Sequence, residues 1–249
     1  MTDSSTTYSE DRLIDGKVLL RQPLSGYRAA IDPVFLAAAV PAFPGDNVLD
    51  VGCGVGAAAL CLAVRLEACT VAGIELQRSL VRFANENIAL NNLAGRVSCM
   101  VGDLTRPPAR FEQGSFSHVM ANPPFFEPSA GTRPGDICKA QAKFEGDADL
   151  AGWIGFALRM VRPKGTIAVI HRADRLDRLL AEFAGRAGEI VIFPLWPDGD
   201  KPAKLVIVRA RKGVATPTRL AHGLILHESD GRYTATAQAV LRRGGALQL

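Results

Sequence analysis

The sequence predicts an α/β protein built on a doubly wound, mostly parallel sheet of seven strands. Short runs of apolar and β-branched residues alternate with helical patterns from residue 48 to residue 211. The first run leads through a glycine-rich turn into an alanine-rich helix. The last two runs are joined by a segment too short for a helical crossover, so they should form an antiparallel pair at one edge of the sheet.

Composition is that of one soluble globular domain with a modest extension. The 249 residues are 48% hydrophobic and 22% charged, with a net charge of +4 that permits an anionic partner without requiring one. No apolar stretch of about 18 residues occurs, so no membrane span is expected. The five cysteines form no C-x-x-C pair and Met1–Ser5 lacks a signal-peptide pattern. We therefore expect reduced thiols, a cytoplasmic location and no metal.

An N-terminal extension, residues 1–45, is expected to pack on a main domain, residues 46–249. Residues 1–10 are polar and should form a frayed tail. Residues 13–20 have apolar runs on both sides of an Asp-Gly dipeptide, which favours a small hairpin with a two-residue turn. An Asp-Pro pair then starts a helix over residues 32–40, because proline suits the first helical position.

The main domain follows in strict alternation until its end. A Lys-Gly turn is expected before the fifth strand, and residues 220–233 predict a second edge hairpin followed by a short basic helix. The expected strands are 48–51, 71–75, 97–103, 116–121, 166–171, 188–194 and 204–211, and the expected helices are 57–66, 78–91, 149–161 and 173–186.

Glycines dominate the turn after the first strand. Gly52, Gly54 and Gly56 permit positive φ and let a ligand approach the backbone, where the amides of the following helix point at it. A nucleotide site is therefore plausible at this turn. The spacing also fits a dinucleotide fingerprint that ends in alanine, and a plain strand-to-helix turn would look the same. The turn alone leaves these three interpretations open.

Acidic residues end the second and third strands. Glu75 can accept hydrogen bonds from both hydroxyls of a ribose, and Asp103 can accept one from an adenine amino group. The fourth strand then runs directly into Asn122-Pro123-Pro124, followed by two phenylalanines. A dinucleotide-dependent enzyme has no use for this tetrapeptide of asparagine, two prolines and an aromatic residue.

In these motifs the chain resembles the class I S-adenosylmethionine-dependent methyltransferases, which have a Rossmann-like fold, and among them those that methylate planar nitrogens. The resemblance implies S-adenosyl-L-methionine as the cofactor. Asp50 and the three glycines would hold its methionine part, and the residues after the second and third strands would hold its ribose and adenine. The cofactor residues implied within the main domain are Asp50, Gly52, Gly54, Gly56, Glu75, Leu76, Asp103, Leu104 and Asn122.

The chemistry would depend on Asn122, Pro123, Pro124 and Phe125. An exocyclic amine on a base is a poor nucleophile because its lone pair is delocalised into the ring. The Asn122 side-chain carbonyl and the Pro123 backbone carbonyl can each accept one N–H, which aims the lone pair at the methyl group. Proline fixes its own backbone, and Phe125 can stack on the base. The rate should then come mainly from proximity and alignment.

A closer resemblance covers roughly residues 13–234 and points to the bacterial tRNA (adenine-N6)-methyltransferases that modify the adenosine 3′ of the anticodon of a valine tRNA. It includes Gln22-Pro23 before the first strand, and its family-selective part is Gly26-Tyr27-Arg28…Asp32. The resemblance implies that the segment Tyr27–Asp32 folds over the cofactor, with Tyr27 or Arg28 near its tail or the target base; the alternative is that this motif only packs the N-terminal part. It also implies that the long segment after the prolines, a candidate lid, reads tRNA. The implied RNA-binding residues are Phe126, Arg133, Lys139 and Lys143.

One departure leaves the target open. That family usually has tyrosine where this chain has Phe125, and phenylalanine occurs there in ribosomal RNA guanine-N2 enzymes too. Methylation of rRNA guanine N2 or of protein glutamine is therefore an alternative. Outside enzymes, the alternative is a non-catalytic RNA-binding module on the same fold.

Overall fold

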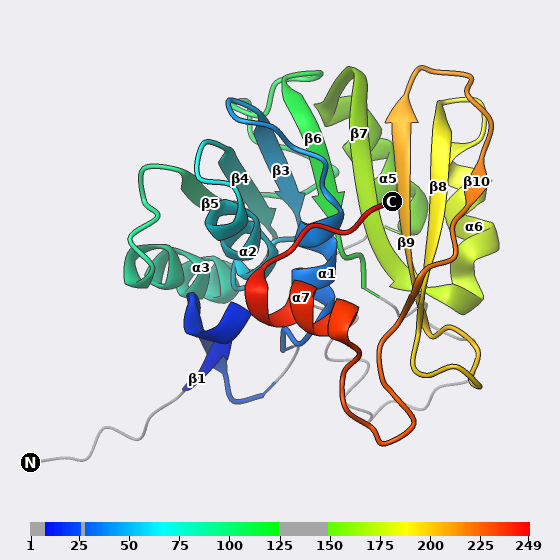
Figure 1. The fold of residues 1–249 in the computed structure, drawn as a ribbon. Coiled ribbons are helices and arrows are strands. Elements are labelled where there is room, and N and C mark those ends of the chain that lie inside the picture. The colour runs from blue at the N-terminus through cyan, green and yellow to red at the C-terminus, as the bar shows by residue number, and fades with distance from the viewer. Residues whose placement is uncertain (1–7, 26–27, 125–148) are drawn as a thin grey trace, which may run out of the picture.

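The computed structural model of the protein describes residues 8–25, 28–124 and 149–249. Within these ranges the main sheet has nine strands and is covered by helices on both faces, while a two-stranded hairpin lies outside it (Figure 1). No helix in the described part of the chain combines the length and the apolar character needed to cross a bilayer.

The hairpin precedes the main sheet and consists of β1 (Tyr8–Leu13) and β2 (Val18–Pro23), joined by the short 3-10 helix η1 (Ile14–Gly16). Leu13 pairs with Val18, so the connection has four residues and the predicted two-residue turn is wrong. Ile14 and Asp15 both adopt positive φ, which this wider loop accommodates. The first strand also begins inside the segment that was expected to be a frayed tail.

Seven long strands form the body of the main sheet and confirm the predicted doubly wound fold. Along the sheet their order is β5-β4-β3-β6-β7-β9-β8. The pairs from β5 to β7 are parallel, whereas β9 is antiparallel to both of its neighbours, so the last long strand is inserted beside the edge. The strands are β3 (Asn47–Val51), β4 (Thr70–Glu75), β5 (Val97–Val101), β6 (Phe116–Ala121), β7 (Val161–Arg172), β8 (Ala187–Trp196) and β9 (Leu205–Lys212).

Side chains that alternate along the strands divide the core into two layers. Val48 and Met120 belong to the cluster under one set of helices, and Leu49 and Val119 to the cluster under the other. In Figure 1 the first set covers the front of the sheet and the second lies behind it. The front helices are α1 (Asp32–Ala39), α2 (Ala57–Arg65), α3 (Arg78–Leu90) and α7 (Ala235–Arg243), and those behind are α5 (Leu150–Met160) and α6 (Leu176–Phe183).

Three boundaries differ from the sequence prediction. β7 starts at Val161, directly after α5, and the expected Lys164-Gly165 turn is an irregularity inside this strand, where Lys164 has a φ of 62°. β5 ends at Val101, two residues before Asp103. The helix after β7 is shorter than expected and follows a 3-10 turn, η2 (Ala173–Arg175).

The chain after β9 returns along the edge of the sheet. β10 (Arg219–Leu220) and β11 (Leu224–Ile225) both pair parallel with β8, so the first part of the predicted hairpin of residues 220–233 is wrong. Gly223 lies between them with φ +83°, and a side chain there would meet the Pro194 carbonyl oxygen at 2.2 Å. The expected turn at residues 229–231 does form: the Glu228 amide donates to the Arg232 carbonyl, and His227 and Tyr233 make an antiparallel bridge.

Candidate active site

The carboxyl ends of β4, β3 and β6 bring three predicted residues into one row. Val51 of β3 pairs with Ile74 on one side and with Ala121 on the other. The next residue along each chain is therefore at the same level: Gly52, Glu75 and Asn122. Ligands of open α/β sheets bind at this end of the strands, so the register itself assembles the predicted site.

The side chains of Asp50 and Asn122 point toward the same layer of the molecule. Asp50 lies two residues after Val48, and Asn122 two residues after Met120, and both of these apolar residues belong to the core under α1 and α2. A pocket opens on that side between the sheet end and the start of α1 and α2. Its lining residues are Ala29, Pro33, Leu36, Asp50, Gly52, Cys53, Gly54, Val55, Ala57, Ala58 and Asn122.

The glycine turn is shaped by two different demands. Gly52, Gly54 and Gly56 all have positive φ. At Gly52 a side chain would meet the Trp153 ring at 2.1 Å, so this glycine is required by packing. At Gly54 no heavy atom of the described residues lies within 4 Å of that position, so the backbone there faces open space among them. The turn therefore leaves room for a ligand at Gly54.

Asp50 is a buried acid inside this pocket, with only 2% of its surface exposed. Its Oδ2 atom makes no hydrogen bond within the described part of the chain. Burial is the main cause that raises the pKa of Asp50 to about 8, and the nearby Glu75 carboxylate acts in the same direction. A cationic amine would supply the missing partner and favour the charged form, so Asp50 fits a ligand that carries an ammonium group.

Glu75 connects the end of β4 to the glycine turn. It is 9% exposed. Oε2 accepts a hydrogen bond of 3.0 Å from the Gly54 amide, and Oε1 accepts one of 2.9 Å from the Gln77 amide. Burial raises the pKa of Glu75, and these backbone amides partly oppose the shift. Leu76, which follows it, is 38% exposed.

Asp103 and Leu104 lie past the end of β5 and do not line the pocket formed by the described residues. The Thr105 amide and hydroxyl donate to Asp103 Oδ1 at 2.8 and 2.7 Å, and these bonds lower the pKa of Asp103. Leu104 packs against the core behind the sheet. Asp103 thus caps its own turn, which is how aspartate commonly acts at the start of a loop. A contact with adenine stays a prediction.

Asn122 and the two prolines follow β6 without a break. Pro123 is buried, and Asn122 and Pro124 are partly exposed. Asn122 lines the pocket across from the glycine turn. The remaining residues predicted here and in the RNA-reading segment lie outside the described ranges, as does Tyr27. They are Phe125, Phe126, Arg133, Lys139 and Lys143.

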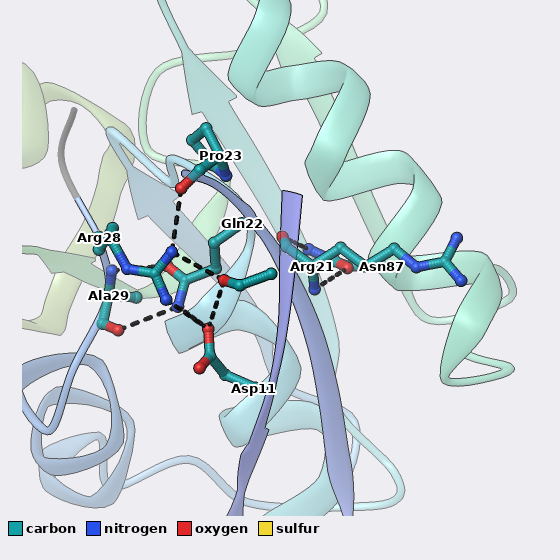
Figure 2. A network of polar contacts seen from close by, with 8 residues as sticks. Asp11, Arg21, Gln22, Pro23, Arg28, Ala29 and Asn87 are labelled. Carbon is teal, nitrogen blue, oxygen red and sulfur yellow. Dashed lines mark hydrogen bonds and ion pairs between the residues drawn. The ribbon is translucent and has the colours of Figure 1, made fainter. Parts of the chain in front are cut away.

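Arg28 points away from the pocket and toward the hairpin. Its guanidinium donates to Asp11 at 2.8 Å, to Ser9 at 2.7 Å and to the Pro23 carbonyl at 3.0 Å, as Figure 2 shows for Asp11 and Pro23. These contacts do not support the predicted cofactor contact of Arg28. Its neighbour Ala29 lines the pocket instead. Asp32 lies in the first turn of α1, where burial raises its pKa.

Two buried amides of the site were not identified as functional from the sequence. Gln22 is 1% exposed and bonds both backbone groups of Ala29. Asn87 of α3 is fully buried and donates to the Val55 carbonyl at 3.0 Å. A polar residue at a core-facing position of a strand or helix is the signal that could have found them.

Four cysteines are described, and all four are buried free thiols. Among the residues that the structure describes, no three His, Cys, Asp or Glu side chains are grouped so that they could hold a metal ion.

The sequence of the chain is similar to those of known methyltransferases. The sequence profile of the methyltransferase small domain matches residues 30–138. A tRNA1(Val) (adenine(37)-N6)-methyltransferase of Aeromonas hydrophila is 26% identical over 83% of this chain and 85% of its own. An rRNA N(6)-adenosine-methyltransferase of Caenorhabditis elegans is 24% identical over 66% of this chain and 69% of its own.

Solved structures resemble the fold as well. The crystal structure of a predicted O-methyltransferase from Agrobacterium tumefaciens has a TM-score of 0.72 and 24% identity, covering 87% of this chain and 98% of its own. A geranyl diphosphate methyltransferase has a TM-score of 0.54 and 17% identity, covering 72% of this chain and 77% of its own. Residues 30–138 therefore resemble a methyltransferase small domain, and the chain has the fold of these solved methyltransferases.

Proposed function

We propose that this methyltransferase transfers a methyl group from S-adenosyl-L-methionine to N6 of an adenine in tRNA. The observation that carries the cofactor assignment is Asp50, a buried acid that lines the pocket and whose Oδ2 has no hydrogen-bond partner among the described residues. Buried polar groups are rarely left without one, so the pocket is suited to a ligand with a donor at this point.

Each part of the cofactor finds suitable groups at this end of the sheet. The Asp50 carboxylate would accept from the ammonium group, and the open space at Gly54 would admit the methionine chain. Glu75 has carboxylate oxygens with further lone pairs for the ribose hydroxyls. When bound, S-adenosylmethionine supplies a methyl group that its positively charged sulfur has already activated. Two methyltransferases of similar fold are described as complexes with sinefungin and with S-adenosyl-L-homocysteine.

Asn122 would orient the acceptor amine. It lines the same pocket as Asp50, and the rigid Pro123 carbonyl is adjacent to it in the chain. Two carbonyl acceptors would bind the two N–H groups of a planar amine and leave its lone pair directed at the donor. No group has to remove a proton before transfer, so alignment would supply most of the rate.

The names of the relatives favour adenine N6 over the other planar amines. The bacterial relative is named for adenine N6 in a tRNA, and the C. elegans relative for N6 of adenosine in rRNA. The two names share the target atom and differ in the RNA. We therefore propose tRNA as the substrate because the bacterial relatives match more of this chain, and rRNA adenine is the second candidate.

The substrate is tested by supplying methyl-labelled S-adenosylmethionine with bulk tRNA, rRNA or a glutamine peptide in separate reactions. The proposal expects label in tRNA. Label in rRNA alone would transfer the proposal to the second candidate, and label in the peptide alone would refute an RNA substrate. RNA binding without any transfer, unchanged in Glu75→Ala and Asn122→Ala, would support the non-catalytic alternative. Action on tRNA implies a cytoplasmic location.

We also propose that residues 1–45 form an extension on the domain of residues 46–249. Arg65 of α2 supports this division, because its guanidinium donates to the carbonyls of Ala37 at 2.9 Å and Val40 at 2.7 Å. The extension is therefore bonded to the last residue of α2, the first helix of the main domain.

A further inference from the structure

We propose that Gln22 is a positioning residue for the methyl donor, because its side-chain amide holds the backbone of Ala29 in the wall of the pocket. The inference rests on the proposed function, since it assumes that the pocket binds S-adenosylmethionine. Ala29 lines the pocket together with Pro33 and Leu36 of α1. The position of this wall is therefore set from outside the glycine turn, by β2.

The bonds between Gln22 and Ala29 resemble those between neighbouring strands. Gln22 Oε1 accepts from the Ala29 amide at 2.7 Å, and Nε2 donates to the Ala29 carbonyl at 3.2 Å (Figure 2). One side chain thus satisfies both backbone groups of a single residue. Because Gln22 is almost fully buried, water could not replace these bonds without cost.

Asp11 fixes which way the Gln22 amide faces. Nε2 of Gln22 also donates to Asp11 Oδ2 at 2.9 Å. A carboxylate can only accept hydrogen bonds, so the NH2 end must face Asp11 and the oxygen must face the Ala29 amide. Arg28 and Ser9 donate to the same carboxylate oxygen at 2.8 and 3.2 Å and hold it in place. The position of Ala29 therefore depends on a charged network in the hairpin.

The neighbouring residue of β2 holds the opposite wall. The Arg21 amide donates to Asn87 Oδ1 at 2.8 Å, and Asn87 Nδ2 donates to the Arg21 carbonyl at 3.0 Å. The same Nδ2 donates to the carbonyl of Val55, which lines the pocket beside Gly54. Two consecutive residues of β2 thus connect to the Ala29 wall and to the Val55 wall. The hairpin sets the distance between the two.

A change at Gln22 should therefore affect the donor and not the acceptor. Asn122, which would orient the acceptor, follows β6 in the main sheet, whereas Gln22 and the wall that it holds belong to the N-terminal part of the chain. If Ala29 is held less firmly, cofactor binding should weaken. RNA binding, and the rate of methyl transfer at saturating cofactor, should stay unchanged. A role limited to stability would lower the melting temperature without this selective effect.

The test compares Gln22→Glu with Glu10→Gln as a matched control. The first variant keeps the size of the side chain but replaces the NH2 donor by an acceptor that faces Asp11 and the Ala29 carbonyl. The control makes an equally conservative change in the same hairpin: it removes the exposed carboxylate that pairs with Arg21 and leaves the backbone bonds of Arg21 to Asn87. Binding of S-adenosylhomocysteine is measured by calorimetry, and KM and kcat are measured for cofactor and for tRNA.

We expect Gln22→Glu to raise the Kd for S-adenosylhomocysteine and the KM for S-adenosylmethionine roughly tenfold, from the loss of about two buried hydrogen bonds. The KM for tRNA and the kcat should stay unchanged, and Glu10→Gln should bind as the wild type does. Adding Asp11→Asn to Gln22→Glu should recover part of the affinity, because an asparagine amide can donate to the introduced carboxylate.

Unchanged cofactor binding in folded Gln22→Glu would overturn the inference, and so would a defect confined to the KM for tRNA. If Gln22→Glu does not fold, Asp11→Ala decides, because it removes the oxygen that accepts from Gln22 Nε2: a raised cofactor Kd supports the inference, and a wild-type Kd overturns it. Failure of the wild type itself to bind S-adenosylhomocysteine would refute the proposed function, which distinguishes that failure from a defect of the variants alone.

Discussion

The Glu75 carboxylate accepts a hydrogen bond of 3.0 Å from the Gly54 amide, so the acid that ends β4 helps to hold the turn that follows β3. Its other oxygen accepts from the Gln77 amide at 2.9 Å. The Glu75 side chain therefore connects the glycine turn after β3 to the chain that follows β4. A ligand that bonds to Glu75 is coupled directly to the conformation of the glycine turn.

We predict that Glu75→Gln weakens cofactor binding. A glutamine has one acceptor oxygen, so either the Gly54 or the Gln77 amide would face an NH2 group and lose its bond. The expected result is a roughly tenfold increase in the Kd for S-adenosylhomocysteine and a melting temperature lower by a few degrees. Glu86→Gln, on the exposed face of α3, is the control and should match the wild type. Equal affinity in Glu75→Gln would contradict this role.

Gly52 and Gly54 should respond differently to alanine. In Gly52→Ala the new methyl group would meet the Trp153 ring at 2.1 Å, so folding stability should fall by several kcal/mol, roughly as in overpacked cores. In Gly54→Ala the cost should be limited to about 1–2 kcal/mol of backbone strain, because no heavy atom of the described residues lies within 4 Å of the added methyl group. We expect Gly54→Ala to melt near the wild type but to bind cofactor poorly. Chemical denaturation and calorimetry separate the two effects, and normal cofactor binding by Gly54→Ala would show that the open space is not used.

Asp50 predicts a pH dependence of stability. Its pKa is raised to about 8 in the folded protein, whereas an unfolded aspartate titrates near 4. Between these values the folded state keeps a proton that the unfolded state has lost, so the free energy of unfolding falls as pH rises through this window. Asp50→Asn should remove this loss and gain stability over the wild type from pH 5 to pH 8. Parallel melting temperatures across this range would contradict the buried, raised pKa.

Cofactor affinity should change with pH in the opposite sense. Asp50 must be ionised to pair with an ammonium group, so wild-type affinity should increase between roughly pH 6 and pH 8 as the raised pKa of Asp50 is crossed. In Asp50→Asn the affinity should be lower and should depend much less on pH. Calorimetry in buffers of different ionisation enthalpy should also detect proton release by the wild type alone. No proton release would refute the assigned partner of Asp50.

Asn122→Ala should separate donor binding from transfer. The side chain would orient the acceptor amine, so its loss should reduce single-turnover transfer roughly 100-fold, as misplacement of a reacting group does. Binding of S-adenosylhomocysteine should change little, because the Asp50 and Glu75 contacts remain. A parallel loss of cofactor affinity would instead assign Asn122 to the donor.

The sequence was sufficient to predict the row of site residues, for a physical reason. Glu75 and Asn122 each follow a short apolar strand, and parallel strands bring such residues to the same edge of a sheet. Local patterns therefore carried the information. The antiparallel pairing of β9 with β8 was likewise expected from the short connection between them, whereas the insertion of β9 beside β7 was not predicted.

Contacts between distant residues were not predictable in this way. Arg28 was assigned to the cofactor because of its motif, yet its guanidinium bonds to Asp11, seventeen residues away in the hairpin. No periodicity encodes such a pair. β10 and β11 each pair with β8, and they do not pair with each other. Gly223, which lies between them, lets the chain pass close to Pro194. Gln22 belongs to a motif of the sequence, but only the structure shows that its side chain bonds to Ala29 and Asp11.

The most direct test is mass spectrometry of nucleosides from tRNA that lacks the modification, after incubation with the protein and S-adenosylmethionine. The account predicts new N6-methyladenosine with the wild type and a large loss of this product with Asn122→Ala, although that variant still binds cofactor. Methylated guanosine in place of N6-methyladenosine, or N6-methyladenosine formed equally well by both proteins, would contradict it.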